Sequence, residues 1–64
     1  MLRLKAERKR LGWSQQELAV QAKMHSSEIC RIERGFSKAW PSQVLRLEKV
    51  FGLPIADLMS EVAG

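Results

Sequence analysis

The residues SQQELAVQAKMHSSEICRIERG, at positions 14–35, decide the fold of this chain. They predict two short helices joined by a tight turn, because apolar residues recur at helical spacing on one side of each. These residues are Leu18, Ala19 and Ala22 in the first helix and Ile29 and Ile32 in the second. Two helices crossing steeply, with small Ala19 at the close approach, form a helix-turn-helix, whose second helix can lie in the DNA major groove.

The ends of the first of these helices carry clear local signals. Ser14 and Glu17 have the spacing of a capping box, and Trp13 precedes the cap as the first member of a hydrophobic staple with Leu18. We therefore expect Trp13 in the core. The turn falls at Lys23-Met24, where Lys23 needs a positive φ without the glycine that adopts it easily.

A further helix is predicted before this unit, over residues 2–11, with Leu4 and Leu11 facing inward. Gly12 ends it in the left-handed conformation that glycine favours after a helix.

The helix after the turn is capped by His25 or Ser26, runs to Arg34 and stops at Gly35, and a loop follows over residues 36–40. Pro41 then suits the first position of a helix over residues 41–51, and a last helix is expected over residues 54–62. The inward side chains of these two helices are Val44, Leu45, Leu47, Glu48 and Phe51, then Ile55, Leu58, Met59 and Val62. The pattern predicts a compact all-α domain of five helices over residues 1–64.

Composition limits the possible classes of protein. The 64 residues are 45% hydrophobic, which is typical of a globular domain, and contain neither a membrane-length apolar run nor a secretory signal. Cys30 is the single cysteine, so no internal disulfide or multi-cysteine zinc site is expected, which suits a reducing cytoplasm. We expect Cys30 to be a partly buried core residue; a thiol sensor is the alternative. Without a nucleophile–base pair, metal cluster or phosphate-cradling loop, we expect no enzyme, metal, cofactor or small-molecule ligand.

Charge is concentrated at the start of the chain. The net charge is +4, and the first ten residues, with five cations and Glu7, also sum to +4. Such a terminus can neutralise DNA phosphates, although basic residues are also common on ordinary solvated helices.

Three segments, LKAERKRLGWSQQELA, ICRIERG and LRLEKVFGLPIADLM, resemble the small DNA-binding domains of phage repressor and Cro type, the XRE family. The resemblance covers residues 2–59. It implies a lambda-repressor-like fold in which helices 2 and 3 form the helix-turn-helix and helix 3 reads DNA. The chain departs from the family pattern at Lys23-Met24, where Gly-Val is usual, and at His25, where Ser or Thr is usual.

The family also pairs an arginine of helix 1 with a glutamate at the end of helix 3. Here Arg8 lies on the inner side of the first helix, and Glu33 follows the inward Ile32. We expect Arg8 and Glu33 to form a buried structural ion pair.

The outward face of the third helix supplies the candidate base-reading residues, which are Ser26, Ser27, Glu28 and Arg31. Arg31 suits guanine, because a guanidinium can donate to both O6 and N7. Glu28 suits the amino group of cytosine, or else it stabilises the first turn of its helix through the helix dipole. The alternative for Arg31 is that it is an ordinary solvated side chain on the surface of the helix.

Four other residues are candidate phosphate contacts, on helix 2, at both ends of helix 3 and in the loop after it. They are Gln15, His25, Arg34 and Lys38. The role of Gln15 and the loop position of Lys38 follow from the family resemblance, and His25 is otherwise a helix cap. Trp40 either packs beneath this loop, which we favour, or flanks the sugar-phosphate chain.

A sequence-specific regulator of transcription that binds double-stranded DNA, as in a Cro-like repressor, is the predicted function. Residues Ile55, Leu58, Met59 and Val62, with Phe36 or Trp40, offer apolar surface for a homodimer on a palindromic operator, or else close the domain. The expected location is the bacterial or phage-infected cytoplasm, at the nucleoid. The alternative is a protein-interaction module such as an antitoxin or accessory regulator.

Overall fold

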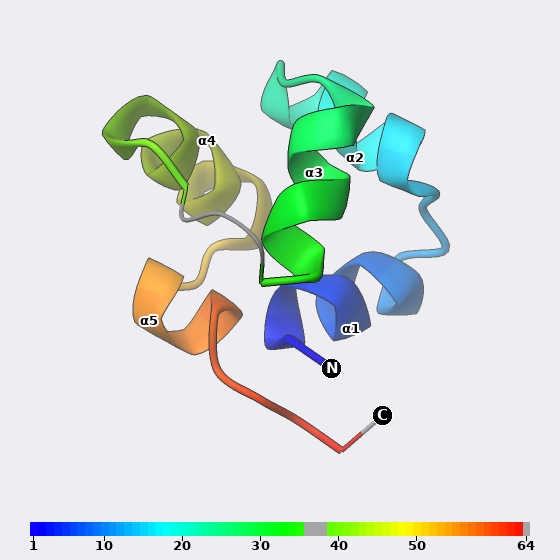
Figure 1. The fold of residues 1–64 in the computed structure, drawn as a ribbon, viewed down its shortest axis with the longest axis vertical. Coiled ribbons are helices and arrows are strands. Elements are labelled where there is room, and N and C mark those ends of the chain that lie inside the picture. Colours follow the sequence, from blue (N-terminus) through cyan, green and yellow to red (C-terminus); the bar gives the residue numbers. More distant parts are fainter. Residues whose placement is uncertain (36–38, 64) are drawn as a thin grey trace.

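The computed structural model describes residues 1–35 and 39–63, and within them the chain forms five helices. They are α1 (Arg3–Arg10), α2 (Gln15–Ala22), α3 (Ser26–Glu33), α4 (Pro41–Phe51) and α5 (Ile55–Leu58). Figure 1 shows α3 at the centre, with α4 on one side, α2 on the other, and α1 and α5 beneath. The predicted all-α, five-helix architecture is confirmed.

The core lies where α2, α3 and α4 meet, and α1 and α5 close it from below. Its fully buried side chains are Leu4, Leu18, Ile29, Ile32, Leu47 and Leu58, with Ala19 and Ala22 between α2 and the helices packed on it. Each large apolar side chain contributes about 1.5–3 kcal/mol when fully buried. Trp13 packs against this core, with its ring 6.3 Å from that of Phe51.

The ends of α2 follow the local signals in the sequence. The Ser14 hydroxyl accepts a hydrogen bond from the Glu17 amide at 3.0 Å, and the Glu17 carboxylate accepts one from the Ser14 amide at 3.1 Å. At the other end Lys23 has φ +55°, the only positive φ among the described residues other than glycine. Both the capping box and the left-handed turn are thus as predicted.

Two leucines predicted to face inward are exposed. Leu11 is 40% exposed because it lies one residue beyond the last turn of α1, where it caps the helix end. Leu45 is 69% exposed. It lies about 200° around α4 from the buried Leu47, so the two side chains cannot both face the core.

The last helix is much shorter than predicted, since it ends at Leu58 and Val62 lies outside it. The chain instead returns beside its own start, as Figure 1 shows at the lower edge of the molecule. Leu2 and Glu61 form an antiparallel bridge, and the Val62 amide donates to the Met1 carbonyl at 2.9 Å. These long-range bonds replace the helical hydrogen bonds that the spacing of the apolar residues predicted.

No helix among the described residues has the length and apolar character needed to cross a membrane.

Candidate nucleic-acid interface

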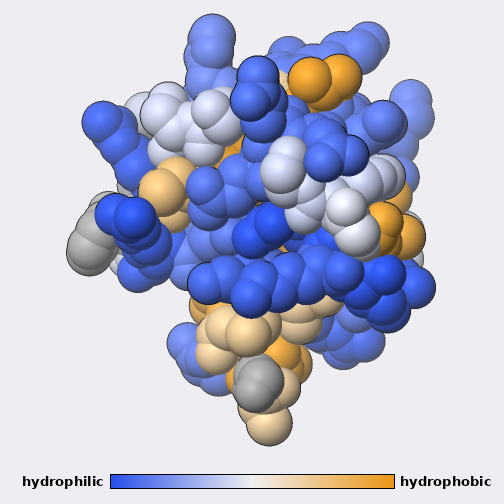
Figure 2. Space-filling view, turned by 90° about the vertical axis from the view of Figure 1, so that its right-hand side faces the viewer, coloured by the Kyte–Doolittle hydropathy of each residue, from blue (hydrophilic) through white to orange (hydrophobic). Residues whose placement is uncertain are grey.

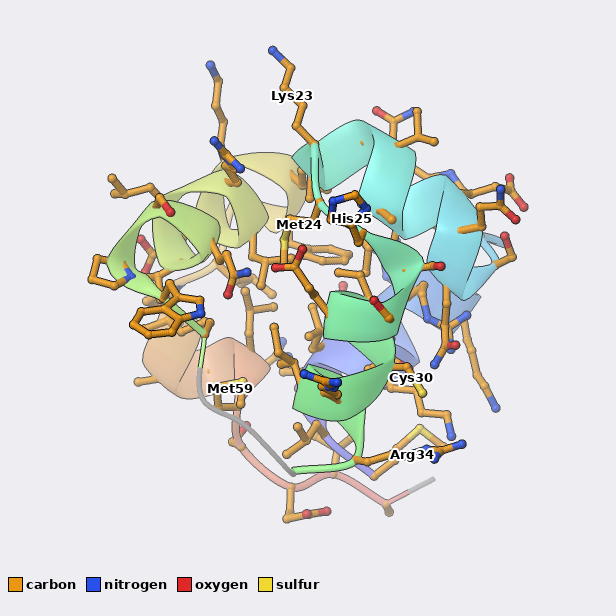
Figure 3. All side chains as sticks on the ribbon, turned by 45° about the horizontal axis from the view of Figure 1, so that its top comes forward. Lys23, Met24, His25, Cys30, Arg34 and Met59 are labelled. Atoms are coloured by element: carbon orange, nitrogen blue, oxygen red, sulfur yellow. The ribbon has the colours of Figure 1, made fainter. Side chains whose placement is uncertain are left out.

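The exposed face of α3 is the centre of the candidate interface. Ile29 and Ile32 fix the opposite face in the core, so Ser26, Ser27 and Arg31 are held exposed. His25 and Arg34, at the two ends of the helix, are also exposed (Figure 3). A short rigid helix with polar and cationic side chains on its outer face has the form needed to enter a major groove.

A buried ion pair fixes the C-terminal end of α3 to α1. The Arg8 guanidinium donates from Nε to Glu33 Oε2 at 2.7 Å and from Nη2 to Glu33 Oε1 at 3.1 Å. Its Nη1 donates to the Trp13 carbonyl at 2.7 Å, which also ties in the segment before α2. Arg8 and Glu33 are the partners that the sequence predicted, and they form a bidentate ion pair. Such a pair is strong and geometrically specific, because the two parallel N–H groups of the guanidinium match the two oxygens of the carboxylate.

Gln15 lies beside this ion pair at the start of α2. Its Nε2 donates to Glu33 Oε1 at 3.1 Å, so the amide is partly buried. A glutamine amide has two N–H donors and one acceptor oxygen, and this bond uses one donor. The contact fixes the orientation of the side chain that the family resemblance assigns to a DNA phosphate.

The carboxylate of Glu28 is held by two neighbours within the protein. Oε1 accepts from the His25 amide at 3.3 Å, and Oε2 accepts from the side-chain amide of Gln43 on α4. Glu28 is half-buried, unlike Ser26 and Ser27. This geometry favours the role of a cap in the first turn of α3 over a contact with cytosine.

The sequence reasoning missed Gln43, which connects α3 to α4. Gln43 is 7% exposed; its Oε1 accepts from the Trp40 amide at 2.9 Å while its Nε2 donates to Glu28. A signal was available, because a glutamine three residues after a helix cap is the spacing of a capping box. The residue joins the start of α4 to the start of the candidate reading helix.

Trp40, which we expected to pack beneath the loop over residues 36–40, has 71% of its surface exposed. It caps α4 with an extended backbone, which Pro41 at the next position favours. Its large side chain therefore remains on the surface beside α4. Lys38, the other predicted contact of this region, lies outside the described residues, as does Phe36.

The comparison with protein families agrees with this geometry. A family model described as helix-turn-helix matches residues 4–58, which include all five helices except the first residue of α1. The chain belongs to this XRE-type helix-turn-helix family, a family of DNA-binding regulators of transcription that are typically not enzymes. Neither the search of curated proteins nor that of solved structures found a match.

Proposed function

We propose that this protein is a sequence-specific regulator of transcription that places α3 in the major groove of double-stranded DNA. The observation that carries the proposal is the exposed face of Ser26, Ser27 and Arg31, on a helix held from behind by its apolar residues and the Arg8–Glu33 pair. Rigid support matters, because base readout depends on hydrogen-bond donors and acceptors that are placed before the duplex arrives.

The contacts divide by role. Arg31 is our candidate for donation to guanine O6 and N7, and Ser26 and Ser27 serve bases or nearby phosphates. The candidate phosphate contacts remain Gln15, His25, Arg34 and Lys38, which would set the register on the duplex. We revise the role of Glu28: its bonds to the His25 amide and Gln43 favour positioning of the helix.

We infer that two copies bind a palindromic site with half-sites about one helical turn apart. A single short helix reads few base pairs, and a two-fold dimer doubles that number. Figure 2 shows that the side formed by α1 and α2 is mostly hydrophilic, with the apolar side chains gathered mainly at its lower end. Trp40 and Leu45, at the start and in the middle of α4, offer exposed apolar surface for a contact between two copies. Leu58 is fully buried and cannot contribute to such a contact.

Exposure of Trp40 and Leu45 also favours the second candidate, a protein-interaction module such as an antitoxin. Salt dependence separates the two, since phosphate contacts make the logarithm of the DNA affinity fall linearly with the logarithm of the salt concentration. The test of the proposal is selection of bound sites from a random oligonucleotide pool. A shared symmetric sequence supports it, and a selected pool as diverse as the starting pool contradicts it.

A further inference from the structure

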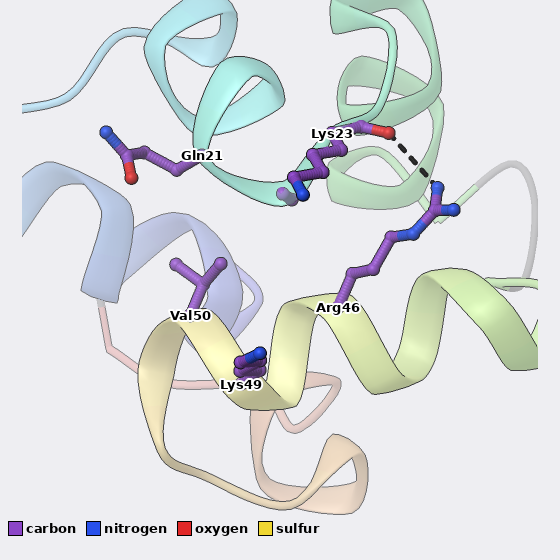
Figure 4. Close-up of a pocket in the computed structure, with 6 residues that line it drawn as sticks. Gln21, Lys23, Arg46, Lys49 and Val50 are labelled. Atoms are coloured by element: carbon purple, nitrogen blue, oxygen red, sulfur yellow. Dashed lines mark hydrogen bonds between the residues drawn. The ribbon is translucent and has the colours of Figure 1, made fainter.

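A surface hollow of about 400 Å³ lies between the end of α2 and the middle of α4 (Figure 4). It is lined by Gln21, Ala22, Lys23, Arg46, Lys49 and Val50. Three of these residues are cationic and none is acidic. A concave surface with charge of one sign concentrates field lines and attracts an oppositely charged ligand.

The backbone at Lys23 is strained in a way that glycine would avoid. Lys23 closes α2 in the left-handed region, at φ +55° and ψ +48°. That conformation is unfavourable for a residue with a Cβ, and glycine adopts it freely. Strain of this kind is often found where a side chain serves function. The lysine places a cation at the edge of the hollow that glycine could not supply.

Arg46 is oriented toward the same place. Its Nη1 donates to the Lys23 carbonyl at 3.1 Å, which is the dashed line in Figure 4. A guanidinium carries five N–H donors, so this bond fixes the group and leaves donors for an anion. Lys49 lies one helical turn further along α4, close to Arg46 on the helix surface.

One edge of the hollow, at Lys23, lies two residues before His25, which caps the start of α3, and Figure 3 shows the Lys23 side chain pointing outward from the molecule. Lys23 precedes Ser26, the first residue of α3, by three positions, so their Cα atoms lie at most about 11 Å apart. The major groove is about 12 Å wide and is bordered by phosphates on both edges. If α3 enters the major groove with its N-terminal end, the hollow comes within reach of the phosphates along one edge of the groove.

From these observations we propose that Lys23, Arg46 and Lys49 bind a backbone phosphate of the same duplex that α3 reads. The inference rests on the proposed function and extends it, since it places a phosphate contact on α4 and the turn before α3. Such a contact carries no base information, so it strengthens binding to operator and random DNA alike.

The test is Lys23→Gly, which removes the cation and relieves the strain together. We expect the melting temperature of this variant to be unchanged or higher, so weaker binding could not result from unfolding. The affinity should fall, and the slope of log affinity against log salt should decrease by about 0.9, the value for one phosphate contact. Lys49→Ala should likewise lower the DNA affinity and reduce the slope of log affinity against log salt.

Gln21→Ala is the matched control, because it removes an exposed but neutral side chain from the lining of the hollow. If wild type binds DNA but Lys23→Gly and Lys49→Ala have the same slope as wild type and Gln21→Ala, the phosphate site is refuted while the proposed function stands. That result is also the one expected if an acidic protein occupies the hollow. If the wild type shows no salt-dependent DNA binding, both proposals fail.

Discussion

Replacement of Arg8 by alanine should remove a large share of the protein's free energy of unfolding. The change leaves the buried Glu33 carboxylate with the Gln15 amide as its one remaining side-chain partner among the described residues, and takes a donor from the Trp13 carbonyl. Removing one partner of a buried pair costs about 3–5 kcal/mol. A domain of 64 residues has a total stability of about 3–10 kcal/mol, at 0.05–0.15 kcal/mol per residue. The loss is therefore comparable to the whole free energy of unfolding.

Urea denaturation followed by circular dichroism measures this loss, and Arg10→Ala is the matched control. Arg10 pairs with Glu7 at 2.9 Å, but its side chain is 65% exposed. An exposed pair contributes only about 0.2–1 kcal/mol, so this variant should remain folded. If Arg8→Ala loses no more stability than Arg10→Ala, the argument that the buried pair holds α1 to α3 is refuted.

Three further substitutions test other parts of the structure. Ser14→Ala removes the hydroxyl that caps α2 and should lower the free energy of unfolding by about 1 kcal/mol in the same denaturation assay; an unchanged midpoint contradicts the role of the cap. Gln43→Leu removes the link between α4 and Glu28. It should reduce the ratio of operator affinity to random-DNA affinity in titrations at fixed salt, and a constant ratio would show that the link does not position α3. Lys38→Ala should weaken binding to operator and random duplexes by the same factor; a loss confined to the operator would mean that Lys38 reads a base.

Helix starts and turns were predictable because their signals are local. Ser14 and Glu17 specify their capping box within a few residues, and Pro41 starts α4 at the predicted position. The positive φ of Lys23 also followed from the spacing of the two helices around it. The apolar periodicity of α2 and α3 then determined which faces meet, as the burial of Leu18 and Ile29 shows.

The extended segment after Leu58 and the second partner of Glu28 were missed because both depend on contacts between distant parts of the chain. The apolar residues after Leu58 have helical spacing, but pairing of Glu61 and Val62 with the start of the chain gives them extended backbone. Trp40 has the hydrophobic side chain of a core residue, yet nothing local indicates that it stays on the surface. The link from Glu28 to Gln43 spans two helices, so sequence alone indicated a carboxylate in the first turn of α3 stabilised by the helix dipole, but not its partner Gln43.

The central claim is that the outer face of α3 reads bases, and methylation interference at guanine N7 tests it directly. The experiment uses the selected operator, with Arg31→Ala as the variant, because Arg31 is exposed and its removal leaves the core intact. Methylation of one guanine in each half-site should block the wild type but have no effect on the variant, which should lose about 1–3 kcal/mol of discrimination at that base pair. If the same guanines interfere with both proteins to the same degree, Arg31 does not read them, and the account of α3 as the reading helix is contradicted.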